Sequence, residues 1–167
     1  MNYLYHHGIK GMKWGVRRYQ NPDGTLTPKG RKRYSNIDSV KTKNGETVYV
    51  AERRNRRSFD NEHNFDIISS GKKVGNLFLE KQGDTLYLNW IDTKKSERGK
   101  GYANSVMNYT VKYAKKNNYK SITLEVPSSS PDARHIYEKH GFIVDNTKVY
   151  DEDDIWGGLT AMKKEIR

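Results

Sequence analysis

A short glycine-containing segment at residues 96–103 carries the residue types best suited to chemistry in this chain. It reads SERGKGYA, with glycine at 99 and 101 and basic side chains at Arg98 and Lys100. Glycine lacks the Cβ atom that would keep a ligand away from the backbone, and the N–H groups at a helix start favour phosphate oxygens. The segment therefore predicts a phosphate-binding turn, although two glycines before a helix also fit an ordinary loop and cap.

The segments before the glycines are expected to form β-structure. A hairpin is predicted over residues 39–51 around Asn44-Gly45, followed by strands at 65–68, 74–79 and 85–92. In the last of these, Leu86, Leu88 and Trp90 alternate with Tyr87, Asn89 and Ile91. Apolar residues on both faces are typical of a central strand.

Helices are expected after the glycines. Apolar residues at three- and four-residue intervals predict a helix over 102–116. A strand at 121–126 follows, then a shorter helix with Ser130 as its N-cap and Gly141 just past its end. Two further strands, at 142–144 and 159–162, complete a mixed α/β layout in which helices pack on one twisted sheet.

Two motifs in this order resemble the GNAT superfamily of acetyl-CoA-dependent N-acetyltransferases. Residues 98–103 are similar to the Arg/Gln-x-x-Gly-x-Gly/Ala motif, which binds the pyrophosphate of the cofactor. Ala133, Tyr137, Gly141 and Phe142 match a second signature, Ala-x-x-x-Tyr-x-x-x-Gly-Phe. The resemblance covers about residues 65–165 and implies a mostly antiparallel sheet with a central, splayed pair of parallel strands.

The same resemblance implies an activity and a set of site residues. The thioester of acetyl-CoA would lie where the strands ending near Thr93 and Val126 separate, and a backbone N–H around residues 91–93 would polarise its carbonyl. An amine attacks, and Tyr137 would protonate the departing sulfur, although Tyr137 also fits a core aromatic. The residues implied to bind the cofactor are Ile91, Thr93, Arg98, Gly99, Lys100, Gly101, Tyr102 and Ala103.

The acceptor side departs from the family. Residues 46–65 show little of the helical pattern expected there and carry Arg53, Arg54, Arg56 and Arg57 instead. An arginine-lined groove would suit an acidic or nucleic-acid acceptor, and a solvated basic loop is the alternative. The acceptor, an amine on a protein, nucleic acid or small molecule, is not identified.

Several other side chains have the chemistry for catalysis or metal binding. Asp92 and Glu125 are the nearest candidates for a general base, and each also fits a paired residue at a strand end. His140 is expected to be packed and hydrogen-bonded. Neither His6-His7 with His63 nor the acidic run at 151–154 has the spacing of a metal site, so no metal is expected.

Composition limits the function classes. The 167 residues carry a net charge of +11, and residues 1–60 alone contribute +9, which favours anionic partners or a solvated basic face. The chain has no cysteine, which excludes disulfides, thiolate metal sites and thiol intermediates. No apolar run approaches about 18 residues, so we expect no membrane partner. The lack of cysteine fits a reducing compartment, and we expect a cytoplasmic protein.

The N-terminal segment is distinct from the rest. It is rich in glycine, aromatic and basic residues, and residues 6–28 resemble a segment of phage and prophage structural proteins of Gram-positive bacteria. The resemblance implies a docking segment at 1–37, with residues 1–35 contacting a phage structural protein, ahead of an acetyltransferase domain at 38–167. A flexible leader, a non-catalytic phage module and a nucleic-acid-binding protein are the alternatives.

Overall fold

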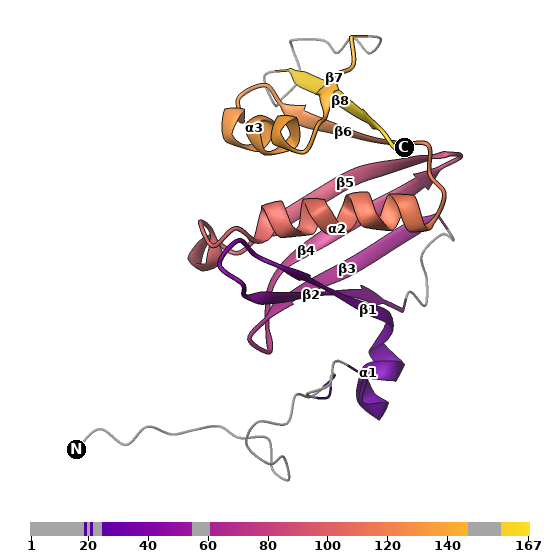
Figure 1. The fold of residues 1–167 in the computed structure, drawn as a ribbon, viewed down its shortest axis with the longest axis vertical. Coiled ribbons are helices and arrows are strands. Elements are labelled where there is room, and N and C mark those ends of the chain that lie inside the picture. Colours follow the sequence, from indigo (N-terminus) through magenta and orange to yellow (C-terminus); the bar gives the residue numbers. More distant parts are fainter. Residues whose placement is uncertain (1–18, 20, 22–24, 55–60, 147–157) are drawn as a thin grey trace, which may run out of the picture.

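The computed structural model describes residues 19, 21, 25–54, 61–146 and 158–167. Its centre is an eight-stranded sheet with the order β1-β2-β3-β4-β5-β6-β8-β7 (Figure 1). The strands are β1 (Tyr34–Lys41), β2 (Thr47–Arg53), β3 (Glu62–Ser69), β4 (Lys72–Gln82), β5 (Thr85–Thr93), β6 (Ser121–Pro127), β7 (Ile143–Val144) and β8 (Leu159–Glu165). The helices are α1 (Pro28–Arg33), the 3-10 turn η1 (Lys95–Glu97), α2 (Tyr102–Lys116) and α3 (Pro131–Lys139).

This architecture confirms the predicted fold class. All neighbouring strands pair antiparallel except β5 and β6, which are parallel and lie in the middle of the sheet. Helix α2 has the predicted bounds. Strand β2 ends at Arg53 and β3 begins at Glu62, and no helix is described over residues 46–65, in agreement with the weak helical pattern there; residues 55–60 lie outside the described residues.

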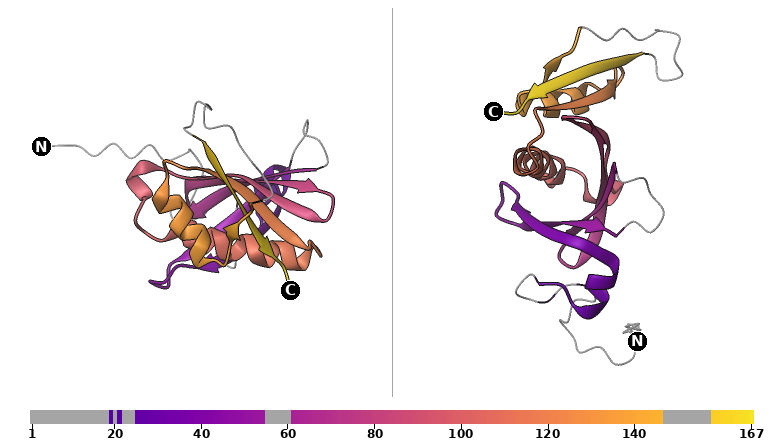
Figure 2. Two further views of the ribbon diagram at one scale, coloured as in Figure 1. Left: turned by 90° about the horizontal axis from the view of Figure 1, so that it is seen from above. Right: turned by 90° about the vertical axis from the view of Figure 1, so that its right-hand side faces the viewer.

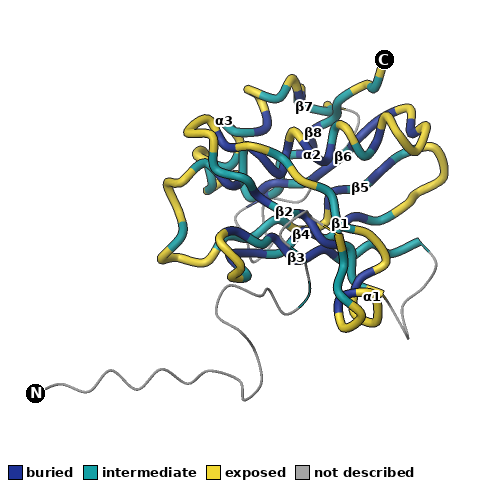
Figure 3. Tube along the Cα trace, turned by 60° about the horizontal axis from the view of Figure 1, so that its bottom comes forward, coloured by how far each residue is buried: buried dark blue, intermediate teal, exposed yellow. Residues whose placement is uncertain are grey.

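Helix α2 covers one face of the sheet (Figure 1; Figure 2). Its inner side chains pack on alternate residues of β2 to β6, because side chains along a strand point to opposite faces. Phe65 of β3, for example, stands edge-on to Tyr109 and Tyr113 of α2, with ring centroids 5.7 and 5.6 Å apart. Most of the buried apolar residues belong to one core cluster of α2 and the sheet, and Figure 3 shows buried stretches along the strands and α2.

A bulge in β5 changes the predicted alternation of that strand. Leu88 pairs with Leu79 and Trp90 with Phe78, so Asn89 is an extra residue. An extra residue shifts which side chains share a face. As a result Ile91, rather than Trp90, continues the buried row of Leu88, and Trp90 is 59% exposed.

The parallel pair separates towards the carboxyl ends of its strands. The ladder between β5 and β6 runs from Thr85 and Ser121 to Leu88 and Leu124 and then stops. β5 continues to Thr93 and β6 to Pro127, held only by their antiparallel neighbours β4 and β8. The strands therefore splay at the bulge, which opens a gap at the centre of the sheet.

The first strand begins earlier than the sequence predicts. β1 starts at Tyr34 rather than at Ser39, so the expected boundary between residues 37 and 38 falls inside a strand. Tyr34 is only 2% exposed. The preceding helix α1 is capped by the Thr27 side chain, which accepts a hydrogen bond from the Gly30 N–H. Within the described ranges, no helix has the length and apolar character needed to cross a bilayer.

Candidate functional site

A cleft of about 540 Å³ opens beside the end of β5, beyond the last residue of β5 that pairs with β6. Its walls come from the end of β5, the loop after η1, the first turns of α2 and the helix α3. Eight of the nine residues that the sequence assigned to the site line it: Ile91, Thr93, Arg98, Gly99, Gly101, Tyr102, Ala103 and Tyr137. Lys100 lines a neighbouring hollow instead.

The glycine loop has the backbone conformation that its sequence suggested. Gly99 and Gly101 have φ angles of +79° and +81°, and a Cβ atom at either position would meet nothing within 4 Å. Gly101 is the N-cap of α2, and no side chain caps this helix. The turn is thus formed by glycine, and its outer surface is open to a ligand that would contact the backbone.

The two basic residues of the loop have different surroundings. Arg98 donates from Nε to the Thr93 carbonyl oxygen at 3.2 Å and so ties the loop to the end of β5. Lys100 forms an ion pair with Glu97, with 2.7 Å between Nζ and Oε2. Glu97 therefore offsets part of the charge that the sequence placed in this loop.

Tyr137 reaches the cleft from α3. The residue is 8% exposed, and its ring stands edge-on to Phe142 with 6.0 Å between the centroids. Burial raises the pKa of its hydroxyl above the ordinary value of 10.0. A phenol that keeps its proton at neutral pH is a competent proton donor.

Asp92 and Glu125, the two candidates for the general base, lie in different environments. Asp92 lines the cleft beside Ile91 and Thr93. Glu125 accepts a hydrogen bond from the Tyr87 hydroxyl at 3.2 Å, and burial together with this carboxylate raises the pKa of Tyr87 to about 12. The structure therefore brings Asp92, but not Glu125, to the cleft.

Besides Asp92, a candidate base, and Ala133, a residue of the second signature, the cleft contains residues that the sequence did not assign to the site. They are Glu97, Asn104, Met107, Asp132 and Ile136. The helical periodicity could have indicated Met107, Ala133 and Ile136 as lining residues, since they lie on the predicted inner faces of the two helices. No sequence pattern indicated Asn104. Its Oδ1 lies 3.2 Å from Nε2 of His140, a contact between α2 and the end of α3. His140 is half-buried, in agreement with the predicted packed and hydrogen-bonded histidine.

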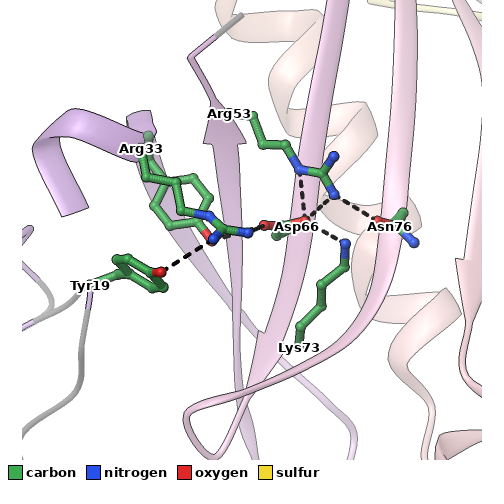
Figure 4. Close-up of polar contacts among 7 residues, drawn as sticks. Tyr19, Arg33, Arg53, Asp66, Lys73 and Asn76 are labelled. Carbon is green, nitrogen blue, oxygen red and sulfur yellow. Dashed lines mark hydrogen bonds and ion pairs between the residues drawn. The ribbon is translucent and has the colours of Figure 1, made fainter. Parts of the chain in front are cut away.

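The described arginines of the basic run, for which an open groove and a solvated loop were the alternatives, have structural partners; those of Arg53 are drawn in Figure 4. Arg53 donates from Nε and Nη2 to Oδ1 of Asp66, at 2.9 and 2.5 Å. Arg54 donates from Nε to the Tyr34 carbonyl oxygen at 3.1 Å. Arg56 and Arg57 lie outside the described residues. The described part of the basic run thus stabilises the sheet and does not form an open arginine groove.

Asp66 is the centre of a larger cluster on the sheet face opposite α2. Its side chain is 1% exposed and also pairs with Lys73 at 2.8 Å and with Arg33 at 3.3 Å. The Tyr34 hydroxyl donates to it at 2.8 Å. Burial alone would raise the pKa of Asp66, but hydrogen bonds from Arg53, Lys73 and Tyr34 outweigh it and hold the pKa at about 2. Through Arg33, which also contacts Tyr19, the cluster holds the described residues before β1 on the sheet.

The candidate metal ligands are not brought together in the described part of the chain. His63 lies 2.8 Å from Glu52, measured from Nδ1 to Oε1. His6, His7 and the acidic run at 151–154 lie outside the described residues. Across the described ranges, no group of three His, Asp or Glu side chains is placed to hold an ion.

Comparison with known families decides the classification. The sequence model of the acetyltransferase (GNAT) family matches residues 33–142, about two thirds of the chain. The chain belongs to the acetyltransferase (GNAT) family. Membership makes this domain an N-acetyltransferase with acetyl-CoA as its acetyl donor. A family of unknown function (DUF7211) matches residues 1–21, and no curated protein matches the chain at a significant level.

Solved structures share the fold of the GNAT domain. An acetyltransferase of Bacillus subtilis in complex with CoA is 17% identical, with a TM-score of 0.55 over 65% of this chain and 80% of the other. A spermidine N-acetyltransferase of Vibrio cholerae in complex with CoA and spermine is 20% identical, with a TM-score of 0.56 over 64% of this chain and 67% of the other. At these identities the likeness concerns the fold alone.

The residues of the cleft fit the cofactor. A pyrophosphate needs backbone N–H donors that no Cβ atom shields, and Gly99 and Gly101 meet this requirement at the start of α2. The acyl end needs an apolar wall beside a polar strand end, and Met107, Ile136 and Ile91 supply apolar surface in the same cleft. Glycines, a helix start and a strand gap thus meet in one place.

Proposed function

We propose that the domain transfers acetyl from acetyl-CoA to an amine by direct attack in the cleft between β5 and α3. The observation that carries this proposal is the meeting of the Gly99–Gly101 loop and Tyr137 in one cleft at the splayed strands. Bound acetyl-CoA supplies the acetyl group as a thioester. Gly99, Gly101 and the first turn of α2 hold its pyrophosphate, with Arg98 fixing the loop to Thr93.

Two groups of the chain act on the reacting atoms in this proposal. A backbone N–H of residues 91–93 stabilises the negative charge that develops on the carbonyl oxygen as the C–N bond forms. Support comes from the unpaired edge of β5 beyond Leu88 on its β6 side. Tyr137 donates its hydroxyl proton to the sulfur as the C–S bond breaks, and burial keeps that proton in place. Asp92 is positioned better than Glu125 to accept a proton from the amine, because it lines the cleft.

The charge of the chain bears on the acceptor. Residues 1–60 carry +9 of the net charge of +11, and this part of the chain repels polycations such as spermidine, on which the Vibrio cholerae enzyme acts, and attracts anionic molecules. We therefore propose an amine carried by an anionic molecule, such as an acidic protein.

We further propose that the N-terminal segment is a separate docking unit, with a phage structural protein as its partner, in a bacterial cytoplasm or on a virion. The match of residues 1–21 to a family of unknown function supports a unit that recurs in other proteins. We place the start of the folded domain before β1, because the GNAT match begins at residue 33 and Tyr34 is buried. A pull-down of phage structural proteins by the full chain, compared with a variant that lacks residues 1–21, tests this partner.

Calorimetric titration with acetyl-CoA tests the proposed cofactor site. Gly101→Glu places bulk and negative charge where the pyrophosphate would lie, and we expect it to abolish micromolar binding. Gly83→Glu is the matched control, since Gly83 also has a positive φ (+62°) and open space but lies in the β4–β5 turn. Equal binding by both variants would refute the site. No binding by the folded wild type would favour a non-catalytic module, and salt-dependent binding of nucleic acid alone would favour a nucleic-acid-binding protein.

A further inference from the structure

A second hollow adjoins the cleft on the other side of the glycine loop. It has a volume of about 480 Å³ and shares Gly99 and Gly101 with the cleft. The turn between β1 and β2 forms one wall, and the end of α3 forms another. Lys41, Lys43, Lys100 and Lys139 line it, and no carboxylate does.

The lysines of this hollow carry charge that the described residues do not neutralise. Lys100 pairs with Glu97, but within the described ranges no carboxylate forms an ion pair with Lys41, Lys43 or Lys139. The neighbouring His140 also experiences this positive charge: burial first, then Lys139 and Lys164, lower its pKa. Gathered like charges repel one another, so a hollow of this kind favours an anion.

The turn between β1 and β2 is held in place against α2. The Tyr102 hydroxyl donates to Glu46 Oε1 at 3.0 Å, and the Ser69 hydroxyl donates to the same carboxylate. The Ser105 hydroxyl donates to the Lys41 carbonyl oxygen at 3.3 Å. Tyr102 and Ser105 belong to the first turns of the helix that begins at the glycine loop. The two lysines of the turn are thus positioned by the helix that begins at the proposed pyrophosphate site.

We propose that this hollow binds the 3′-phosphate of CoA, and that Lys43 and Lys139 make the enzyme select CoA over 3′-dephospho-CoA. The inference rests on the proposed cofactor site. In CoA the pyrophosphate separates the acyl-bearing arm from the phosphorylated nucleoside. With the arm in the cleft beside Tyr137 and the pyrophosphate at Gly99 and Gly101, the nucleoside side lies across the loop, where the lysines are. The hairpin formed by β1 and β2 is then a part of the cofactor site.

Affinities for CoA and 3′-dephospho-CoA, measured by calorimetry on the full chain, test the proposal. We expect the wild type to bind CoA about tenfold more tightly, as a charged hydrogen bond on a partly exposed site provides. Lys43→Glu with Lys139→Glu should remove the preference, and the milder double alanine variant should reduce it. Both side chains are exposed, so the variants should fold. Lys116→Glu is the control, since it reverses the charge of an exposed lysine at the far end of α2.

Each other outcome contradicts the proposal in a recognisable way. Equal wild-type affinity for the two ligands would overturn the 3′-phosphate site and leave the proposed cofactor cleft intact. A preference that survives in the double glutamate variant would assign it to other residues. Loss of oligonucleotide binding in that variant, with the CoA preference unchanged, would assign the lysines to nucleic acid. Failure of the wild type to bind either ligand would overturn this inference together with the proposed function.

Discussion

Arg53 donates two hydrogen bonds to a single carboxylate oxygen of Asp66 on the sheet face opposite α2. Nε and Nη2 of Arg53 lie 2.9 and 2.5 Å from Oδ1 of Asp66, and Nη2 also donates to Asn76 at 3.0 Å. The contact joins β2, β3 and β4 beside the point where β4 pairs with the end of β5. An arginine that suggested acceptor binding in the sequence therefore stabilises the sheet.

Replacing this carboxylate should destabilise the fold. Asp66→Asn leaves the cations around it without their counter-charge, and we expect a loss of about 3 kcal/mol in the free energy of unfolding, measured in urea. Asp84→Asn is the matched control, because its ion pair with Lys120 is exposed on both sides. We expect no measurable change there. A similar midpoint for wild type and Asp66→Asn would contradict the structural role of the cluster.

The Asp66 cluster also predicts a pH dependence. Its folded pKa of about 2 lies below the value of about 3.9 for an unfolded chain, so the folded state favours the charged form. The stabilisation is fully present above about pH 5 and is lost as the pH falls towards 2. The difference in unfolding free energy between wild type and Asp66→Asn should therefore shrink in acid. A difference that grows in acid would reverse the sign we assign.

Gly75 controls how closely β4 approaches the end of β5. A Cβ atom at this position would lie 2.1 Å from the Asp92 carbonyl oxygen. We expect Gly75→Ala to cost about 2 kcal/mol in unfolding free energy and to lower kcat, because it displaces the strand that lines the cleft. Gly83→Ala tests the control case of a glycine with nothing within 4 Å, where only the positive φ of +62° is strained and the β4–β5 turn lies away from the cleft. If both variants lose the same activity, the close approach has no role in the site.

Tyr137→Phe should separate catalysis from binding. Loss of the donor hydroxyl is expected to lower kcat about 100-fold and to leave acetyl-CoA affinity nearly unchanged. Tyr109→Phe removes the same atom from a tyrosine of the core that does not line the cleft. Because burial raises the pKa of Tyr137 above 10.0, the wild-type rate should not fall with pH until above about pH 10. Full activity of Tyr137→Phe would remove the assigned acid and leave the cofactor site standing.

Glu46 should matter for cofactor selection without touching the cofactor. Its carboxylate accepts from Tyr102 and Ser69, which fixes the turn that carries Lys43. We expect Glu46→Ala to weaken CoA binding several-fold more than 3′-dephospho-CoA binding, by calorimetry. Glu80→Ala is the control, since Glu80 also accepts a side-chain hydrogen bond, from Asn61, away from the cleft. Equal weakening for both ligands would show that the turn supports the fold only.

The sequence by itself determined the local features of this protein. The bounds of α2, the glycine turn before it and the position of Tyr137 on α3 follow from spacing, because helix periodicity and positive-φ glycines are local properties of the chain. Both motifs keep their order and separation along the chain. Eight of the nine predicted site residues consequently line one cleft.

Tertiary structure decided the features that depend on partners distant in the chain. The bulge at Asn89 and the exposure of Trp90 follow from pairing with β4. The early start of β1 follows from the hydrogen bond between Tyr34 and Asp66, 32 residues apart. The lysine hollow requires the β1–β2 turn to meet α2 and α3. Such contacts join residues that are far apart in the chain. They form only when the chain folds, so no local pattern in the sequence predicts them.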